Sequence, residues 1–258
     1  MTGQEVRAVM QFSYGGRTIR INMSDMPAVI TEITRRLRLK EGFALATLNL
    51  DHLVKLRNDP SFRQAYAEQD LVCADGNPIV WLSRLADRPV TLVPGSDLVV
   101  PLTRLAAAED APIALVGTTE HALKAAAASL ERAAPGITIC ATIAPPMGFD
   151  PDSPEAGALL QQVQSSGARM CFLALGAPKQ ELLAARGRRE VPGIGFVSIG
   201  AGLDFLAGNQ RRAPMWVRRI AMEWAWRMGS APRRLVPRYA GCAAILPSEI
   251  AAALKLRR

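Results

Sequence analysis

Short apolar runs alternate with longer amphipathic stretches along most of the chain. The runs predict six strands, at residues 43–48, 71–74, 113–116, 137–142, 170–175 and 195–199. Helical spacing predicts helices near residues 27–39, 52–69, 77–86, 97–109, 119–134, 154–167 and 178–189. Strands that are apolar at consecutive positions are typical of a sheet covered on both faces. The alternation therefore predicts an α/β fold with a mostly parallel sheet and helices on both faces.

The first part of the chain has the pattern of a β-hairpin. Residues 9–14 and 17–22 flank Gly15 and Gly16, which suit the positive φ that a two-residue hairpin loop requires. Residues 1–8 contain no apolar run of the kind found in a secretory signal. Since no stretch of 18 apolar residues follows, we expect neither a signal peptide nor a transmembrane helix.

The basic charge of the chain is concentrated at its C-terminal end. The 258 residues have a formal net charge of +8. Residues 208–258 carry ten Arg and one Lys against Glu223 and Glu249, whereas the first 207 residues carry 20 basic and 21 acidic side chains. We therefore divide the chain into a body, residues 1–208, and a basic appendage, residues 209–258. A basic segment on a neutral body indicates an anionic partner: nucleic acid, a lipid surface or a phosphorylated substrate.

One stretch of the appendage, residues 215–228, predicts an amphipathic helix rich in tryptophan. Arg219, Glu223 and Arg227 recur every four residues and form a polar stripe. Three of the four Trp residues of the chain lie in this stretch. Such a helix beside arginines resembles an interfacial membrane helix, and a helix docked on the body is the alternative.

Several common site motifs are absent from the sequence. The four cysteines form no CxxC pair, so we expect free thiols in a reducing cytoplasm and no zinc site. They are Cys73, Cys140, Cys171 and Cys242. There is no GxxxxGK[ST] sequence, and Phe205 occupies the third glycine position of a GxGxxG fingerprint begun by Gly200 and Gly202. Neither a P-loop nor a dinucleotide site is favoured.

Polar residues and glycines follow directly after most of the predicted strands. They are Thr47, Asn49, and residues 75–77, 117–119, 176–181 and 200–202. In open α/β sheets, ligands bind beyond the carboxyl ends of the strands. A helix that begins there also points backbone N–H groups at an anion. The sequence therefore predicts a ligand site at this edge of the sheet.

Three carboxylates stand at such turns, and each has two interpretations. Asp75 follows a strand and is either a helix cap or a general base that projects into a cleft. Asp97 follows the turn that begins at Pro94, and a helix N-cap is its better interpretation. Asp204 lies just before Gly208 and fits either role.

Two further polar groups have a local and a functional interpretation. Thr47 and Asn49 alternate on a strand, so both are expected to face the same side and to need polar partners. They form either a local turn or a contact to sugar or phosphate. Residues 179–181 open a helix, either as a solvated first turn with Glu181 matched to the helix dipole or with Gln180 bound to a polar ligand.

Five segments, in this order, resemble one known family. They are ATLNLDHL at 46–53, ADGNPIVW at 74–81, VPGSDL at 93–98, LGAPKQE at 175–181 and GAGLDFLAGNQRRAPMWVRRIAMEWAWR at 200–227. Together they look like the WecG/TagA/CpsF family of bacterial glycosyltransferases, glycosyltransferase family 26. The resemblance extends over about residues 20–239.

The resemblance implies a Rossmann-like fold and an inverting, metal-independent enzyme that needs no cofactor. Such an enzyme moves a hexose or N-acetyl-hexosamine from a UDP-sugar to a polyprenyl-diphosphate-linked acceptor in exopolysaccharide or other cell-surface polysaccharide synthesis. It also implies a cytoplasmic protein, peripheral at the inner face of the cytoplasmic membrane, which the appendage touches. Self-association into a homo-oligomer is an open expectation, and no nucleic-acid partner is expected.

The resemblance also implies site residues. Asp75 matches the proposed general base. The residues expected to bind substrate are Thr47, Asn49, Gly76, Asn77, Gly95, Asp97, Gly176, Lys179, Gln180, Glu181, Gly200, Asp204, Arg212, Arg227, Arg234 and Arg238.

The sequence departs from the family pattern at Leu92, where the family has an arginine. Arg88 lies close by and is a candidate replacement. The alternative function is a non-enzymatic module of the same fold that binds a nucleotide-sugar or a polyanion. The donor sugar and the acceptor glycan stay open, because they depend on the shape of the pocket.

Overall fold

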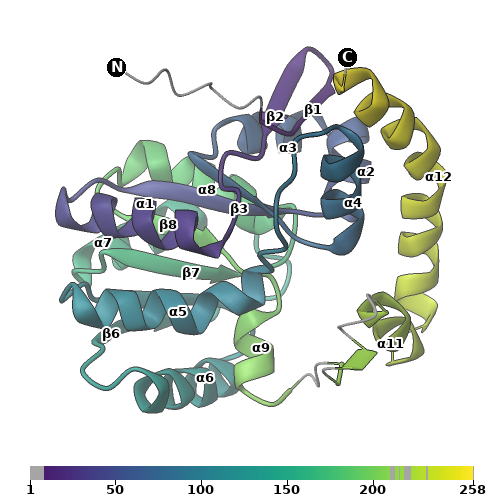
Figure 1. Ribbon diagram of the computed structural model, residues 1–258. Helices are drawn as coiled ribbons and strands as arrows, with labels where there is room; N and C mark the ends of the chain where they lie inside the picture. Colours follow the sequence, from purple (N-terminus) through teal and green to yellow (C-terminus); the bar gives the residue numbers. More distant parts are fainter. Residues whose placement is uncertain (1–8, 210–212, 215, 218–221, 231, 258) are drawn as a thin grey trace, which may run out of the picture.

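Six parallel strands form the central sheet of the computed structural model, which describes residues 9–209, 213–214, 216–217, 222–230 and 232–257 (Figure 1). The strand order is β4-β3-β8-β7-β5-β6, and every described pair is parallel. The strands are β3 (Phe43–Leu48), β4 (Leu71–Ala74), β5 (Ile113–Gly117), β6 (Ile139–Ile143), β7 (Met170–Ala174) and β8 (Gly195–Ser198). The predicted α/β class and the six predicted strands are confirmed.

Helices cover both faces of this sheet, as the apolar runs predict. One face packs against α1 (Met26–Arg38), α5 (Gly95–Ala108) and α6 (Glu120–Ala133), which lie in front of the sheet in Figure 1. The other face packs against α7 (Pro154–Ser165) and α8 (Lys179–Glu190). Alternate side chains of β3 divide between the two layers, since Phe43 and Leu45 pack in the first and Ala44 in the second.

The predicted hairpin is confirmed as a two-stranded antiparallel sheet. Strand β1 (Gln11–Tyr14) pairs with β2 (Arg17–Arg20) across Gly15 and Gly16. Phe12 and Ile19 face each other in the register and are both buried. Their cluster also includes side chains of α2 (Leu50–Asn58), α3 (Pro60–Ala67) and α4 (Asn77–Leu85).

The single helix predicted near residues 52–69 is wrong, because the chain forms α2 and α3 there. Asp59 separates them, and its side chain accepts hydrogen bonds from the N–H groups of Ser61 and Phe62 at the start of α3. Pro60 lies in the first turn of α3 and has no N–H to continue α2. The Asp-Pro pair therefore ends one helix and begins the next.

The helix predicted over residues 215–228 is also not continuous. Met222 lies outside any helix, and α11 runs from Glu223 to Ser230. It follows α9 (Gly202–Leu206) along the chain and precedes α12 (Pro232–Leu256), the long helix at the right of Figure 1. Of the predicted polar stripe, Glu223 is the first residue of α11, whereas Arg219 and the side chain of Arg227 lie outside the described residues.

The last helix, α12, packs along α2 and α4. Its side chains Leu235, Cys242, Ile245 and Ala253 are buried, and Ile245 and Ala253 join the hairpin cluster. By length and composition, Leu235–Leu256 could also cross a membrane, although no such helix was expected from the sequence. The most apolar 18-residue stretch of this helix has a mean hydropathy of 1.2, and 22% of that stretch is buried against the rest of the protein.

Candidate active site

The carboxyl ends of four neighbouring strands carry most of the predicted site residues. In sheet order, Asp75 follows directly after β4 and Asn49 directly after β3, whereas Gly200 and Gly176 lie two residues beyond the ends of β8 and β7. After β3 the chain leads to the edge strand β4, whereas after β8 it leads to α9, which packs against α5 and α6. Such a change of direction leaves a crevice at the carboxyl edge of an open sheet. The topology therefore places these residues where an α/β protein binds its ligand.

Asp75 lies at this edge and is half-buried. Its N–H donates to the carbonyl of Leu48 at 2.7 Å, which fixes its backbone against the end of β3. The next residue, Gly76, has φ +103° and ψ 137°, a conformation open essentially to glycine alone. Gly76 is also the N-cap residue of α4, so the interpretation of Asp75 as the cap of this helix is wrong. The role of general base stays a prediction.

Thr47 and Asn49 do not both lie on the strand, as their alternation predicted. Strand β3 ends at Leu48, with Thr47 buried within it. Asn49 is instead the N-cap of α2, where its Oδ1 accepts from the N–H of His52 at 3.0 Å. The local turn bond is thus the observed state of Asn49.

The segment from Leu92 to Asp97 runs across the same edge. Leu92 bridges to Ala74, the residue before Asp75, and is 40% exposed. Gly95 is buried, and a Cβ there would lie 3.1 Å from the Cα of Ile199 at the end of β8. The predicted N-cap role of Asp97 is wrong, because α5 begins two residues earlier and Asp97 lies in its first turn.

The guanidinium of Arg88 is engaged away from Leu92. It donates to the carbonyls of Val9 and Leu256, at 3.1 and 3.0 Å. These bonds tie the C-terminal end of α12 to the segment that enters the hairpin. Arg88 therefore has a structural role, and nothing in its contacts makes it the replacement for the missing arginine.

The first turn of α8 follows β7 and holds Lys179, Gln180 and Glu181. The solvated turn considered for this segment is wrong, because Gln180 is 2% exposed and Glu181 is 0% exposed. Gln180 Nε2 donates to Glu181 Oε1 at 2.8 Å, and Gln180 Oε1 accepts from the N–H of Gly200 at 3.1 Å. Gln180 thus connects the ends of β7 and β8.

Asp204 connects a further strand end to the site. Its Oδ1 accepts from the hydroxyl of Thr118 at 2.5 Å, which joins the first turn of α9 to the end of β5. A Cβ at Gly202 would lie 2.9 Å from Cγ2 of Val99, so α9 packs closely on α5. Asp204 accordingly has a structural bond within the edge.

The appendage reaches the site through Arg238. Its Nη2 lies 2.9 Å from Oδ2 of Asp51, in the first turn of α2 and two residues after Asn49. Asp51 also pairs with Lys55; burial would raise the pKa of Asp51, but these cations lower it. Arg212 and the side chains of Arg227 and Arg234 lie outside the described residues.

A buried polar network lies behind the edge and was not foreseen from the sequence. His52 Nδ1 lies 2.9 Å from the hydroxyl of Tyr66, and its ring is also hydrogen-bonded to the backbone of Thr47. Burial lowers the pKa of His52 to about 3. Burial raises the pKa of Glu181 to about 7, because only Gln180 and its own N–H favour the charged form at close range. No periodicity or motif marks such long-range contacts.

These two groups predict opposite pH dependences of stability. Unfolded His52 titrates near 6.5, so its contribution is present above that pH and is lost as the pH falls towards 3. Unfolded Glu181 titrates near 4.5, so its contribution is present below that pH and is lost as the pH rises to about 7. Urea unfolding between pH 4.5 and 7 should show a shallower rise of stability with pH for His52→Gln than for the unchanged chain, and a steeper rise for Glu181→Gln. Parallel curves for all three would contradict both assignments.

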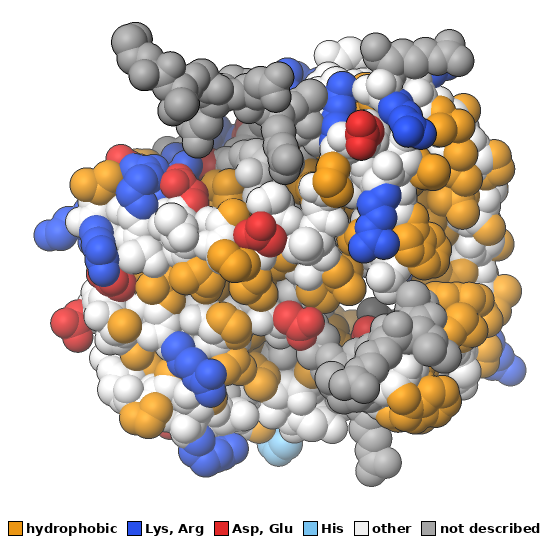
Figure 2. Space-filling view, viewed as in Figure 1, with side chains coloured by type: hydrophobic (Ala, Val, Ile, Leu, Met, Phe, Trp, Pro, Cys, Tyr) orange, Lys and Arg blue, Asp and Glu red, His pale blue; other side chains and the backbone are white. Residues whose placement is uncertain are grey.

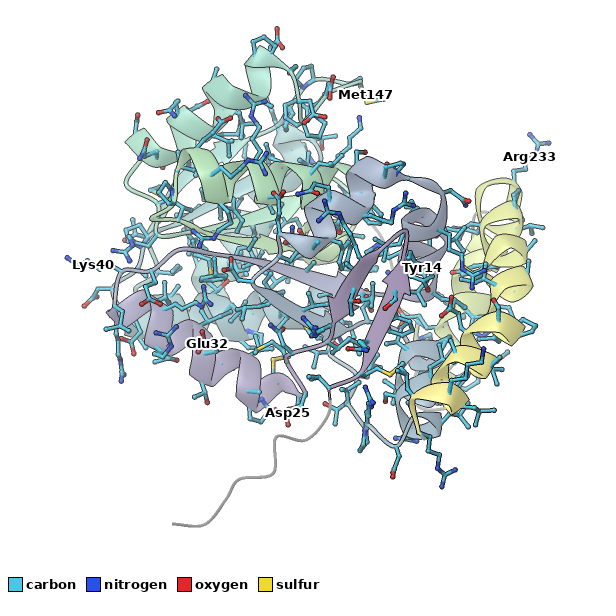
Figure 3. All side chains as sticks on the ribbon, turned by 90° about the horizontal axis from the view of Figure 1, so that it is seen from above. Tyr14, Asp25, Glu32, Lys40, Met147 and Arg233 are labelled. Atoms are coloured by element: carbon cyan, nitrogen blue, oxygen red, sulfur yellow. The ribbon has the colours of Figure 1, made fainter. Side chains whose placement is uncertain are left out.

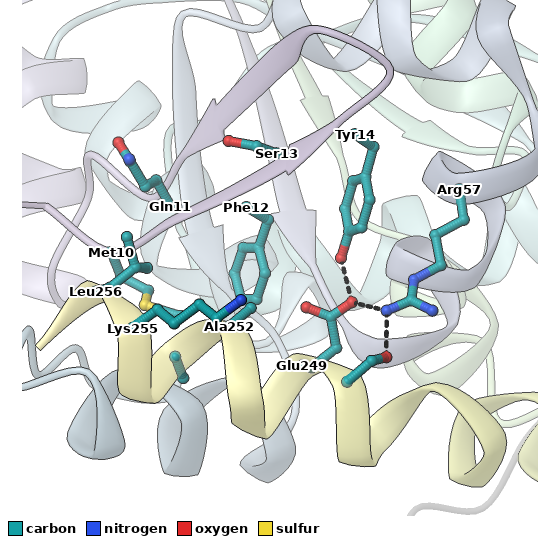
Figure 4. Close-up of a pocket in the computed structure, with 12 residues that line it drawn as sticks. Met10, Gln11, Phe12, Ser13, Tyr14, Arg57, Glu249, Ala252, Lys255 and Leu256 are labelled. Carbon is teal, nitrogen blue, oxygen red and sulfur yellow. Dashed lines mark hydrogen bonds and ion pairs between the residues drawn. The ribbon is translucent and has the colours of Figure 1, made fainter.

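A separate cavity of about 400 Å³ lies between the hairpin and α12 (Figure 4). Tyr14 and Arg57 converge there on Glu249, which is buried. Arg57 is in the last turn of α2, and Asn49 caps the other end of that nine-residue helix. At 1.5 Å per residue the two places are more than ~10 Å apart. This cavity is therefore distinct from the carboxyl edge. The bonds from Tyr14 and Arg57 to Glu249 connect α12 to the hairpin and to α2.

The described part of the appendage exposes both apolar and basic side chains. Trp216, Trp224 and Trp226 are 65%, 45% and 44% exposed. Figure 2 shows hydrophobic side chains gathered over α12, and Figure 3 shows Arg233 pointing away from the body at the start of that helix. The described residues contain four free cysteines and no group of three His, Cys, Asp or Glu side chains placed to hold a metal ion.

The family that the five segments resemble is supported by an independent comparison. The model of the glycosyl transferase WecG/TagA/CpsF family matches residues 17–258, which include the hairpin strand β2, the whole sheet and α12. The match therefore extends over nearly the whole chain. The Rossmann-like sheet and the polar residues at its carboxyl edge agree with it. The chain belongs to the WecG/TagA/CpsF family of glycosyltransferases.

Proposed function

We propose that this glycosyltransferase moves a hexose or N-acetyl-hexosamine from a UDP-sugar to a polyprenyl-diphosphate-linked sugar, by inversion and without a metal ion. The observation that carries the proposal is a half-buried carboxylate, Asp75, at the carboxyl edge of a sheet to which the basic appendage is tied. The family match supports transfer of a sugar. The charge of the appendage supports a substrate with phosphate groups.

In the proposed reaction, Asp75 takes the proton of the acceptor hydroxyl as its oxygen attacks C1 of the donor sugar. The bond from C1 to the phosphate oxygen breaks on the opposite face, so the anomeric configuration inverts and UDP leaves. One carboxylate is enough for this single displacement. The proton ends on Asp75 and the negative charge on the diphosphate.

The developing charge on the diphosphate needs cations or oriented N–H groups nearby. Four described helices at the edge have an N-cap residue that makes no capping side-chain hydrogen bond: α4, α5, α8 and the five-residue α9. In contrast, helices α1, α2, α3, α6 and α7 each have a capping side chain; the caps are Asp25, Asn49, Asp59, Thr119 and Ser153. Uncapped N-termini bind anions well. They support a diphosphate between the edge and the arginines of the appendage, Arg238 among them.

Acceptor-dependent release of UDP tests the proposed function. The full chain is incubated with EDTA, a panel of UDP-sugars and a short-chain polyprenyl-diphosphate-linked sugar. Release with one donor, only when the acceptor is present, supports the proposal and identifies the sugar. UDP binding without turnover for any donor would favour the alternative, a nucleotide-sugar-binding module.

We further propose that the appendage holds the protein at the anionic inner face of the cytoplasmic membrane. Exposed tryptophans beside arginines are suited to the lipid interface. Replacing Trp216, Trp224 and Trp226 together by Ser should weaken binding to phosphatidylglycerol vesicles at least on the order of tenfold, because exposed apolar area is lost. Vesicle co-sedimentation measures the change.

A matched control is Leu39→Ser, since Leu39 is 59% exposed at the end of α1, just before the start of β3. It removes exposed apolar area at the amino edge of the sheet, far from the appendage. Equal vesicle binding by the triple variant and the control would argue against membrane contact through these tryptophans.

A further inference from the structure

Glu181 is a buried acid at the carboxyl edge that the proposed reaction does not use. Its side chain is fully buried at the first turn of α8, so it cannot touch a substrate. Glu181 Oε1 accepts from Gln180 Nε2 at 2.8 Å, and Oε2 has no hydrogen-bond partner among the described residues. A buried carboxylate oxygen without a partner is costly, which points to a role other than stability.

The contacts of Glu181 decide which way the Gln180 amide points. An ionised carboxylate only accepts hydrogen bonds, so the NH₂ end of Gln180 must face it. The carbonyl end then faces the N–H of Gly200, a donor, at 3.1 Å. The flipped amide would oppose oxygen to oxygen and donor to donor, so one orientation alone satisfies both neighbours.

Gly200 is the residue whose position this orientation controls. It follows β8 with φ +57°, a left-handed conformation that glycine adopts readily. Strand β8 lies between β3 and β7, so the Gly200 turn stands at the centre of the edge. The bond from Gln180 holds this turn to the adjacent strand end.

We propose that Glu181 is a positioning residue for sugar transfer, which acts by fixing the Gln180 amide and, through it, the Gly200 turn at the end of β8. The inference rests on the proposed function, because it assigns a role within that reaction. Charged groups near Glu181 are Lys55 and Asp51 of α2, and Tyr66 of α3 also lies close. Since burial raises the pKa of Glu181 to about 7, the test is made at pH 8, where the carboxylate form predominates.

Glu181→Gln tests the role, because an amide at 181 can present either a donor or an acceptor to Gln180. We expect the kcat for transfer to fall on the order of tenfold to a hundredfold, with a smaller change in KM. The Gly200 N–H should exchange with solvent at least ten times faster, whereas amides within β8 keep their protection. Glu120→Gln is the matched control, since Glu120 is an exposed acid in the first turn of α6.

A second variant restores the pattern of donors and acceptors. With Gln180→Glu and Glu181→Gln combined, the amide at 181 donates to the carboxylate at 180, whose other oxygen accepts from Gly200. Slow exchange of Gly200 should return in this variant, even where Glu181→Gln alone is too unstable to assay. Unrestored exchange in a folded double variant would overturn the proposal.

Wild-type kcat and wild-type Gly200 exchange in Glu181→Gln would also overturn it, as would a loss of protection spread evenly over the whole sheet. These outcomes differ from a failure of the proposed function. In that case the unchanged chain itself transfers no sugar, and the exchange of Gly200 alone decides whether Glu181 holds the turn.

Discussion

Asp75→Asn should abolish most sugar transfer and leave the fold intact. The amide has almost the shape of the carboxylate but cannot take a proton from the acceptor hydroxyl, so kcat should fall about 10²- to 10⁴-fold, the usual contribution of a general base. The backbone bond from Asp75 to Leu48 and the glycine conformation at Gly76 do not depend on the charge. Steady-state kinetics with saturating donor measures the loss.

The matched control for this variant is Asp87→Asn, after the other end of α4. Asp87 is exposed with φ +57°, a conformation that asparagine adopts readily. The control should keep its activity, and both variants should unfold at the urea concentration of the unchanged chain. Undiminished transfer by Asp75→Asn would remove Asp75 from the role of base.

Glu249→Ala should detach α12 from the body and lower the free energy of unfolding by about 3 kcal/mol. Glu249 is 3% exposed and accepts from the hydroxyl of Tyr14 at 2.6 Å and from Arg57 Nη2 at 2.5 Å. Burial, and then Glu249, raise the pKa of Tyr14, so the hydroxyl stays protonated and donates. Truncation leaves both partners without their acceptor, and the partial exposure of Arg57 puts the cost at the low end for a broken buried pair.

Two further variants separate the buried pair from charge in general. Glu249→Gln keeps an acceptor for Tyr14 and should cost less than Glu249→Ala. Glu41→Ala removes an exposed pair with Arg35 and should cost less than about 1 kcal/mol. Urea unfolding gives the energies, and hydrogen exchange of α12 shows whether the helix has detached. Equal stability of Glu249→Ala and Glu41→Ala would show that this contact does not hold the appendage.

The sequence allowed the elements to be predicted better than their arrangement. Each apolar run became a strand, because a run of apolar residues is a local signal; the run is buried throughout in β3, for example, and only partly buried in β6. The order β4-β3-β8-β7-β5-β6 could not be predicted, since short apolar runs are interchangeable and their pairing is decided by long-range packing. The break between α2 and α3 was missed, although Asp59 and Pro60 are both strong signals for the start of a helix and could have predicted it.

The site shows the same division. The position of Asp75 at the carboxyl edge was predicted, because polar residues that follow buried strands collect at one edge of the sheet; its role as general base stays a prediction. The burial of Gln180 and Glu181 was not, because two polar residues at a helix N-terminus have the local pattern of a solvated turn. Arg238 and Asp51 are 187 positions apart in the sequence, and Arg57 and Glu249 are 192 apart, so no local pattern marks these pairs.

The central claim is that this chain transfers a sugar to a polyprenyl-diphosphate-linked sugar and uses Asp75 to do so. The most direct measurement follows a radiolabelled sugar from its UDP donor into a polyprenyl-diphosphate-linked acceptor, with EDTA present, for the unchanged chain and for Asp75→Asn side by side. We expect labelled lipid from the unchanged chain, in equal amount to the UDP released, and little or none from the variant. Absence of labelled lipid for every donor, with a folded protein that still binds UDP, would contradict the account.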